Sequence, residues 1–208
     1  MNKIKTRIEK SIRWAILLLS LIILIYIVRS LLQKDIANFD NAVYSFVASF
    51  ISEPLTDIAL VITTLGSAYI ILPLCLILII VFWKRIEGIA ISINLIISFL
   101  SNQILKRIVA RPRPTEYRIV EELGYSFPSG HSMVGMAFYG LLIYLIYRKV
   151  KNPYIKWTSC ILLTILIFLI GLSRVYLGVH YASDVLAGFC ISAAYLALFT
   201  QVIAHKIK

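Results

Sequence analysis

Acidic side chains are scarce in this sequence. Asp and Glu together number 10 among 208 residues, against 21 Lys and Arg, and all charged residues make up only 15% of the chain. An ordinary soluble domain carries about 25% charged residues. So few charges exclude a disordered chain, a coiled coil and any sizeable soluble second domain, because each of these needs a well-solvated surface.

Cysteine is also rare, and its placement excludes two further classes. The three cysteines, Cys75, Cys160 and Cys190, all lie within apolar runs. Their spacing matches neither a disulfide framework nor a zinc site, and no other cluster of His, Cys or carboxylate residues has metal-ligand spacing. We therefore expect three buried packing residues and a protein that uses no metal and no cofactor.

Apolar residues are abundant and make up 60% of the chain. One membrane-spanning helix needs about 20 mostly apolar residues, so this content suffices for six spans. The sequence predicts an all-α fold, a polytopic membrane helix bundle in one domain, residues 1–208. The net charge of +11 is typical of cytoplasmic loops and of contact with anionic headgroups, so the bilayer, and not nucleic acid, is the expected partner.

The predicted helices can be placed along the chain. Six spans are expected at about 14–32, 68–83, 88–105, 131–147, 155–172 and 181–204. Residues 42–51 are expected to form a short amphipathic helix in the membrane interface, and the chain around it is mixed in character. The basic N-terminal segment is followed by no cleavage signal, so the first span is expected to be retained.

The third span differs from the others because it carries a polar face. Asn94, Ser98 and Ser101 fall on this face. A polar stripe on a spanning helix usually faces the bundle interior and forms hydrogen bonds between helices. We interpret it as a packing surface.

Counts of Lys and Arg predict the orientation in the plasma membrane. With the N-terminus in the cytoplasm, thirteen of these residues lie inside and eight outside, which satisfies the positive-inside rule and places both termini in the cytoplasm. Five of the eight outer residues nevertheless lie in one loop, 106–128. A basic loop on the wrong side of the membrane indicates that the loop binds an anion.

Three short polar segments lie at span ends that this topology places on the same, outer side of the membrane. They are Lys106–Pro114 after the third span, Pro128–Ser132 at the start of the fourth, and Ser173–Asp184 from the end of the fifth to the start of the sixth. Their common location predicts one extracytoplasmic active site.

The residue types in these segments favour phosphoryl transfer. A phosphate group needs several fixed cations, which Lys106, Arg113 and Arg174 can supply. Ser129 and Gly130 open the fourth span, where free backbone N–H groups and the positive helix end attract an anion.

Two histidines supply the reactive groups in this interpretation. His180 and Asp184 are four residues apart and are therefore expected on one helical face at the start of the sixth span. Asp184 can then hold one ring nitrogen of His180 and leave the other free as a nucleophile. His131 lies on a different span and can protonate the leaving oxygen.

The pattern K-x6-RP, PSGH and SR-x5-H-x3-D resembles the three-part signature of the type 2 phosphatidic acid phosphatase superfamily. It is complete between residues 106 and 184. Six spans suit the membrane branch of that superfamily, which includes the phosphatidylglycerophosphatase B and undecaprenyl pyrophosphate phosphatase group. The resemblance implies a metal-independent lipid phosphatase with a phosphohistidine intermediate. It also implies that His180 is the nucleophile, that Asp184 is its partner and that His131 is the general acid. The residues that it implies bind the phosphate are Lys106, Arg113, Ser129, Gly130 and Arg174.

The sequence leaves three questions open. The substrate could be undecaprenyl pyrophosphate, phosphatidylglycerophosphate or phosphatidic acid, each of which presents a phosphate near the outer interface. The same intermediate would serve a lipid phosphotransferase, and a non-catalytic lipid-binding or transport protein is a further alternative. The oligomeric state is not predicted.

Overall fold

The structure is a computed structural model that describes residues 3–204, with side chains from residue 7 onward. Over this range the chain is all-helical and contains no strand. The helices are α1 (Lys3–Leu32), α2 (Ile36–Ala48), α3 (Glu53–Leu65), α4 (Ala68–Val81), α5 (Ile86–Val109), α6 (Gly130–Lys149), α7 (Pro153–Tyr176) and α8 (Ala182–Ile203). Lys206 and Lys208, which entered the charge count, lie outside the described residues.

The predicted polytopic helix bundle is confirmed. Five helices, α1, α5, α6, α7 and α8, are long and apolar enough to cross a membrane. The sixth crossing differs from the prediction, because α4 alone covers only about 21 Å of the roughly 30 Å hydrocarbon core. The helices α3 and α4 follow one another at a 42° bend, and together they are long and apolar enough to cross a membrane as one broken span.

The helix α3 was missed because its sequence looks interrupted. Pro54 lies at the first turn, where the missing backbone N–H costs no hydrogen bond, so it does not break the helix. Asp57 is exposed and needs no buried partner. A helix is present near 42–51, as predicted: α2, which begins and ends a few residues earlier; its place in the membrane interface stays a prediction.

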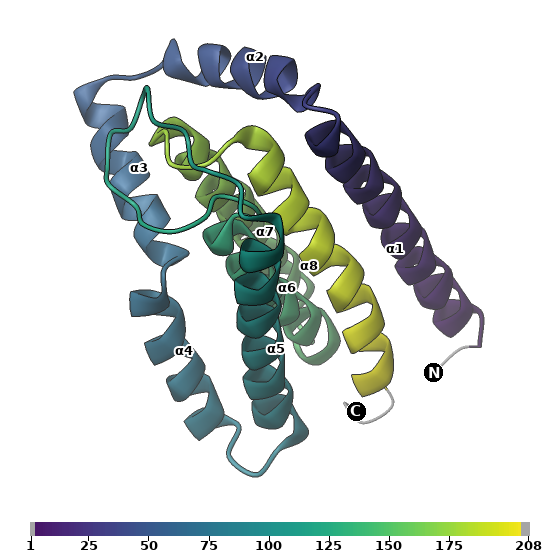
Figure 1. Ribbon diagram of the computed structural model, residues 1–208. Helices are drawn as coiled ribbons and strands as arrows, with labels where there is room; N and C mark the ends of the chain where they lie inside the picture. Colours follow the sequence, from purple (N-terminus) through teal and green to yellow (C-terminus); the bar gives the residue numbers. More distant parts are fainter. Residues whose placement is uncertain (1–2, 205–208) are drawn as a thin grey trace.

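The helix α6 lies at the centre of the bundle and packs against α5, α7 and α8 (Figure 1). The helix α1 packs along α8 at one edge, and α4 packs along α5 at the other. The predicted polar face of α5 packs inward: Asn94 Nδ2 donates to the Ala137 carbonyl at 2.8 Å, and Ser98 is buried. Over one end of this bundle run α2 and the long loop between α5 and α6 (Figure 1).

The first turns of α6 and α8 lie in close contact. A Cβ atom on Gly188 would lie 3.0 Å from the Ser129 carbonyl oxygen and 3.1 Å from the Met133 nitrogen, so a larger residue here would push the two backbones apart by a few tenths of an ångström. The Ser129 N–H donates to the Asp184 carbonyl at 3.1 Å. This contact brings the second and third polar segments together.

Candidate active site

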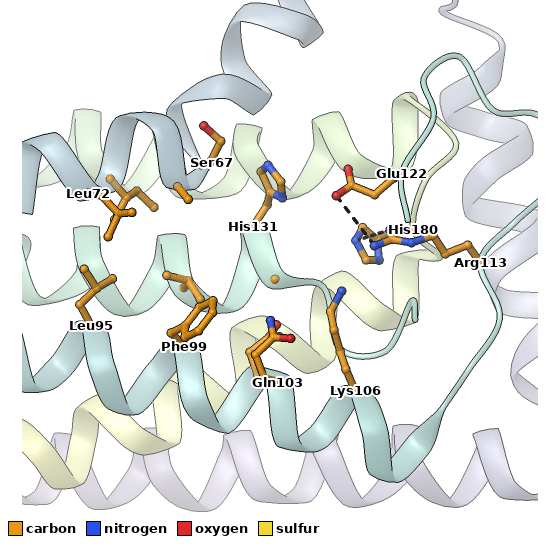
Figure 2. Close-up of a pocket in the computed structure, with 16 residues that line it drawn as sticks. Ser67, Leu72, Leu95, Phe99, Gln103, Lys106, Arg113, Glu122, His131 and His180 are labelled. Carbon is orange, nitrogen blue, oxygen red and sulfur yellow. Dashed lines mark hydrogen bonds and ion pairs between the residues drawn. The ribbon is translucent and has the colours of Figure 1, made fainter. Parts of the chain in front are cut away.

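One cavity of about 390 Å³ joins the three polar segments, and its two ends differ in chemistry. Charged and titratable side chains line one end: Lys106, Arg113, Glu122, His131 and His180. Apolar side chains of α4, α5 and α6 line the other end: Ile71, Leu72, Leu95, Phe99 and Val134. Figure 2 shows the apolar side chains at one side of the close-up and the charged ones at the other. The cavity is therefore amphipathic along its length.

The predicted site residues gather around this cavity in two layers. Five of them, Lys106, Arg113, Gly130, His131 and His180, line it directly. Asp184 lies behind His180, with Nδ1 and Oδ2 3.6 Å apart. Arg174 reaches the site through an ion pair with Glu122, which lines the cavity. Ser129 is buried, and its hydroxyl is occupied at the start of α6, where it accepts from the Ser132 hydroxyl at 3.0 Å.

His180 lies in the turn between α7 and α8, two residues before α8 begins. Gly178 makes this turn possible, because its φ of +68° is one that other residues adopt only at a cost. The predicted pairing of His180 with Asp184 is present, but the two do not share a helical face. Instead, Asp184 turns back to accept from the Tyr181 N–H at 3.0 Å, which brings its carboxylate to the imidazole.

The hydrogen bonds of His180 define its tautomer. Its Nε2 lies 3.0 Å from Nη1 of Arg113, and a guanidinium can only donate, so Nε2 carries a lone pair. The proton of the neutral ring is then on Nδ1, which lies 3.3 Å from the Ser126 hydroxyl. Ser126 in turn donates to Oδ2 of Asp184 at 2.5 Å. Ser126 and Asp184 therefore hold the protonated nitrogen, while Nε2 is unprotonated and accepts from Arg113.

The electrostatic surroundings keep this ring neutral. Burial lowers the pKa of His180, and the nearby charges of Arg113 and Arg174 also lower it; against the opposing effect of Asp184, the resulting pKa is about 4. Only 2% of the residue is exposed. A neutral imidazole is the form that can attack phosphorus.

His131 faces the same cavity from the first turn of α6 (Figure 2). The bend between α3 and α4 packs against its ring: a Cβ atom on Gly66 would lie 3.3 Å from Cδ2 of His131. The two histidines thus reach one cavity from different elements, as the sequence predicted.

The cationic side chains are held by the loop between α5 and α6. Lys106 Nζ donates to the Tyr125 carbonyl at 2.8 Å. Arg113 donates to the carbonyls of Leu123, Gly124 and Val179 at 3.0, 3.0 and 2.9 Å. These bonds fold the loop over the charged end of the cavity and fix the direction of both cations.

Glu122 is an acidic residue within this cationic site, and the sequence did not point to it. Its carboxylate pairs with Arg174 and lies 3.9 Å from Arg113. Burial would raise the pKa of Glu122, but the charge of Arg174 and the hydrogen bond from it outweigh that effect and hold the pKa below its ordinary value. The Nε of Arg174 is buried and has no hydrogen-bond partner among the described residues.

Arg111, Asp40 and Ser126 also belong to the site and were not predicted. Arg111 pairs with Asp184 at 2.7 Å and with Asp40 at 2.8 Å. The basic loop offered a signal for Arg111, which stands two residues before Arg113. Nothing marked Asp40, because it meets Arg111 from a position 71 residues away.

The fold and the cavity together define a class: a multi-pass membrane protein in which paired histidines and fixed cations lie at the polar end of an amphipathic chamber. The chain belongs to the PAP2 superfamily, which it matches over residues 87–208. Among the described residues, no group of three or more His, Cys, Asp or Glu could hold a metal ion.

Particular relatives support this assignment over nearly the whole chain. Phosphatidylglycerophosphatase B of Bacillus subtilis (strain 168) is 31% identical over 91% of this chain and 95% of its own length. An undecaprenyl-diphosphatase of Sulfolobus acidocaldarius is 27% identical over 91% of this chain and 90% of its own. The crystal structure of a transmembrane PAP2-type phosphatidylglycerolphosphate phosphatase from Bacillus subtilis matches with a TM-score of 0.77 at 29% identity, covering 94% of this chain and 97% of that one.

Proposed function

We propose that this protein is a lipid phosphatase that hydrolyses a phosphate monoester or a pyrophosphate through a phosphohistidine on His180. One observation carries the proposal: the unprotonated Nε2 of His180, which accepts from Nη1 of Arg113 at 3.0 Å, lies at a cavity that is charged at one end and apolar at the other. The charged end suits the phosphate, and the apolar end suits the lipid. The names of the relatives favour undecaprenyl pyrophosphate and phosphatidylglycerophosphate as substrates, with phosphatidic acid as a third candidate.

The geometry supports a two-step mechanism. In the first step, Nε2 of His180 forms a bond to phosphorus, the bond from phosphorus to the leaving oxygen breaks, and His131 donates a proton to that oxygen. The ring of His180 then carries a positive charge, which Asp184 stabilises. In the second step, His131 takes a proton from water, which attacks phosphorus and restores the free imidazole. Charge on the equatorial oxygens is stabilised by Lys106, Arg113 and Arg174.

We propose that the reaction needs no metal ion. The three cationic side chains and the N-terminus of α6 supply positive charge on several sides of the phosphate. Ser129 contributes through the start of that helix, because its hydroxyl is already used as a cap. Activity should therefore persist in excess chelator, and loss of activity that Mg²⁺ restores would contradict the proposal.

We further propose that the chain is one phosphatase domain, residues 1–208, with both termini in the cytoplasm and the active site outside. The start of α1 and the end of α8 lie at the end of the bundle opposite the loop between α5 and α6, which carries Arg113 and Glu122, and this supports the proposed orientation (Figure 1). A reporter fused after Lys208 should be cytoplasmic. An extracytoplasmic reporter would reverse the assignment.

The experiment that tests the function is phosphate release by the purified protein in detergent from each of the three candidate lipids. His180→Ala should abolish turnover and the acid-labile phosphoenzyme formed from labelled substrate. His131→Ala should slow both steps but still form some phosphoenzyme with a good leaving group, and Asp184→Asn should slow the attack. His205→Ala, which changes the third histidine of the chain, serves as the control.

The outcome also separates the alternatives. Label that remains on His131, or turnover by His180→Ala near the normal rate, would show that the roles are assigned wrongly. Product that forms only when an acceptor lipid is added would indicate a phosphotransferase, and a protein that forms no phosphoenzyme from any of the lipids would support the non-catalytic alternative.

A further inference from the structure

A buried ionic network behind His180 connects the reaction centre to α2. Asp40, near the middle of α2, is 2% exposed. Its Oδ1 accepts from the Ser183 N–H at 2.8 Å, and its Oδ2 accepts from the Ser183 hydroxyl and from Nη2 of Arg111, both at 2.8 Å. Every one of these partners lies next to the proposed reaction centre, in α8 or in the loop between α5 and α6.

Arg111 links the two carboxylates of this network. Its Nη2 binds Asp40, and its Nη1 donates to Oδ1 of Asp184 at 2.7 Å. The guanidinium also lies over the Tyr181 ring, 3.8 Å from the centroid. Because a guanidinium is a rigid planar fork, it holds both carboxylates in one fixed arrangement.

This arrangement determines which oxygen of Asp184 meets the histidine. Arg111 occupies Oδ1, so Oδ2 is left for Ser126 and for the Nδ1 side of His180. The network also affects charge. One guanidinium shared between two carboxylates leaves a net negative charge behind the imidazole, whereas a guanidinium paired with Asp184 alone would neutralise it.

We propose that Asp40 is a positioning residue for the reaction: through Arg111 it orients Asp184 and keeps that carboxylate negative enough to activate His180. The inference rests on the nucleophilic role of His180 proposed above. It makes α2 part of the active site. Two consecutive ion pairs, Asp40 with Arg111 and Arg111 with Asp184, join α2 to the carboxylate behind the reacting histidine.

A purely structural role, in which Asp40 only fastens α2 to the bundle, would give a different result. Loss of packing lowers the amount of folded protein but leaves the pH profile of the folded fraction unchanged. Loss of positioning shifts the acid limb of the profile to lower pH, because Arg111 then neutralises Asp184 and the protonated form of His180 loses stabilisation. The other charged or titratable groups that face His180 or its surroundings stay as they are: Lys106, Arg113, Glu116, Glu122, His131, Arg174 and Tyr181.

The test compares Asp40→Asn with a matched control, Asp35→Asn, which changes an exposed carboxylate at the start of the same helix. Phosphoenzyme formation is measured by rapid quench with labelled p-nitrophenyl phosphate over a range of pH. We expect Asp40→Asn to form phosphoenzyme about 10- to 100-fold more slowly, with a nearly unchanged KM and an acid limb at lower pH, as is typical when a hydrogen-bonded partner of a reactive group is lost. Asp40→Glu should recover part of the rate, and Asp35→Asn should behave like the unchanged protein.

Each result decides the inference. A normal rate in Asp40→Asn, or a loss that is equal at every pH and matches a loss of folded protein, would overturn it. If Asp40→Asn does not fold, Arg111→Lys replaces it: a lysine keeps the charge but cannot bridge both carboxylates, so a normal rate there would also overturn the inference. Turnover by His180→Ala would instead refute the proposed function. A failure of the proposed function can therefore be distinguished from a failure of the proposed role of Asp40.

Discussion

Substitution of Glu122 by Gln should tighten the binding of inorganic phosphate, because Glu122 occupies the guanidinium groups that we propose bind the anion. Its carboxylate pairs with Arg174, lies 3.9 Å from Arg113 and lines the cavity beside both histidines. A phosphate that uses these two guanidinium groups must displace the carboxylate. Glutamine keeps the shape of the side chain and one accepting oxygen but removes the competing charge.

The structure sets the size of this effect between two limits. Two unit charges at the 3.9 Å separation of Glu122 and Arg113 attract by about 4 kcal/mol at an effective dielectric constant of about 20. The side chain of Glu122 is 31% exposed, and fully exposed pairs contribute only about 0.2–1 kcal/mol. We therefore expect the Glu122 carboxylate to weaken the binding of phosphate by about 1–2 kcal/mol. Phosphate should accordingly bind about 5- to 30-fold more tightly to Glu122→Gln.

The assay is inhibition of turnover by inorganic phosphate, with Glu121→Gln as the control because Glu121 is the exposed neighbour of Glu122. The pKa of Glu122 is held below its ordinary value by Arg174, so the carboxylate stays ionised and the difference should persist from about pH 5 to pH 8. Equal or weaker phosphate inhibition of Glu122→Gln would refute the competition, and an equal gain in Glu121→Gln would attribute the effect to net charge alone.

Two further predictions follow from the turn that carries His180. The pKa of His180 is lowered to about 4, so phosphoenzyme formation from a substrate with a good leaving group should stay constant from neutral pH downward and fall only as the pH passes through about 4. An acid limb near the ordinary pKa of histidine would contradict this prediction. Gly178→Ala should destabilise the protein by about 1–3 kcal/mol, because φ is +68° and the new Cβ would collide with the Tyr117 carbonyl. Gly124→Ala has a similar φ of +77° with no atom within 4 Å, so thermal unfolding should show a smaller loss, and an equal loss would mean that the collision contributes nothing.

The sequence alone determined the class of fold and most of the residues around the cavity. In lipid every backbone polar group must be satisfied internally, so long apolar runs can only be helices, and five of the six predicted spans correspond to single helices. Charged residues are costly in such a chain, so the few that cluster at span ends stand out as functional. For this reason the sequence alone could point to Lys106, Arg113, His131 and His180, which line the cavity.

The tertiary structure alone decided how those residues are held and which others join them. The helix α3 was missed because a proline and an aspartate hide its apolar content, and it becomes visible as a half-span only through its packing on α7 and α4. Ser126 meets Asp184 across 58 residues, and Asp40 meets Ser183 across 143. Local periodicity reports whether a residue faces lipid or protein, but it carries no information on which distant side chain it will meet. That choice depends on how closely whole helices pack, as where Gly188 allows the starts of α6 and α8 to touch.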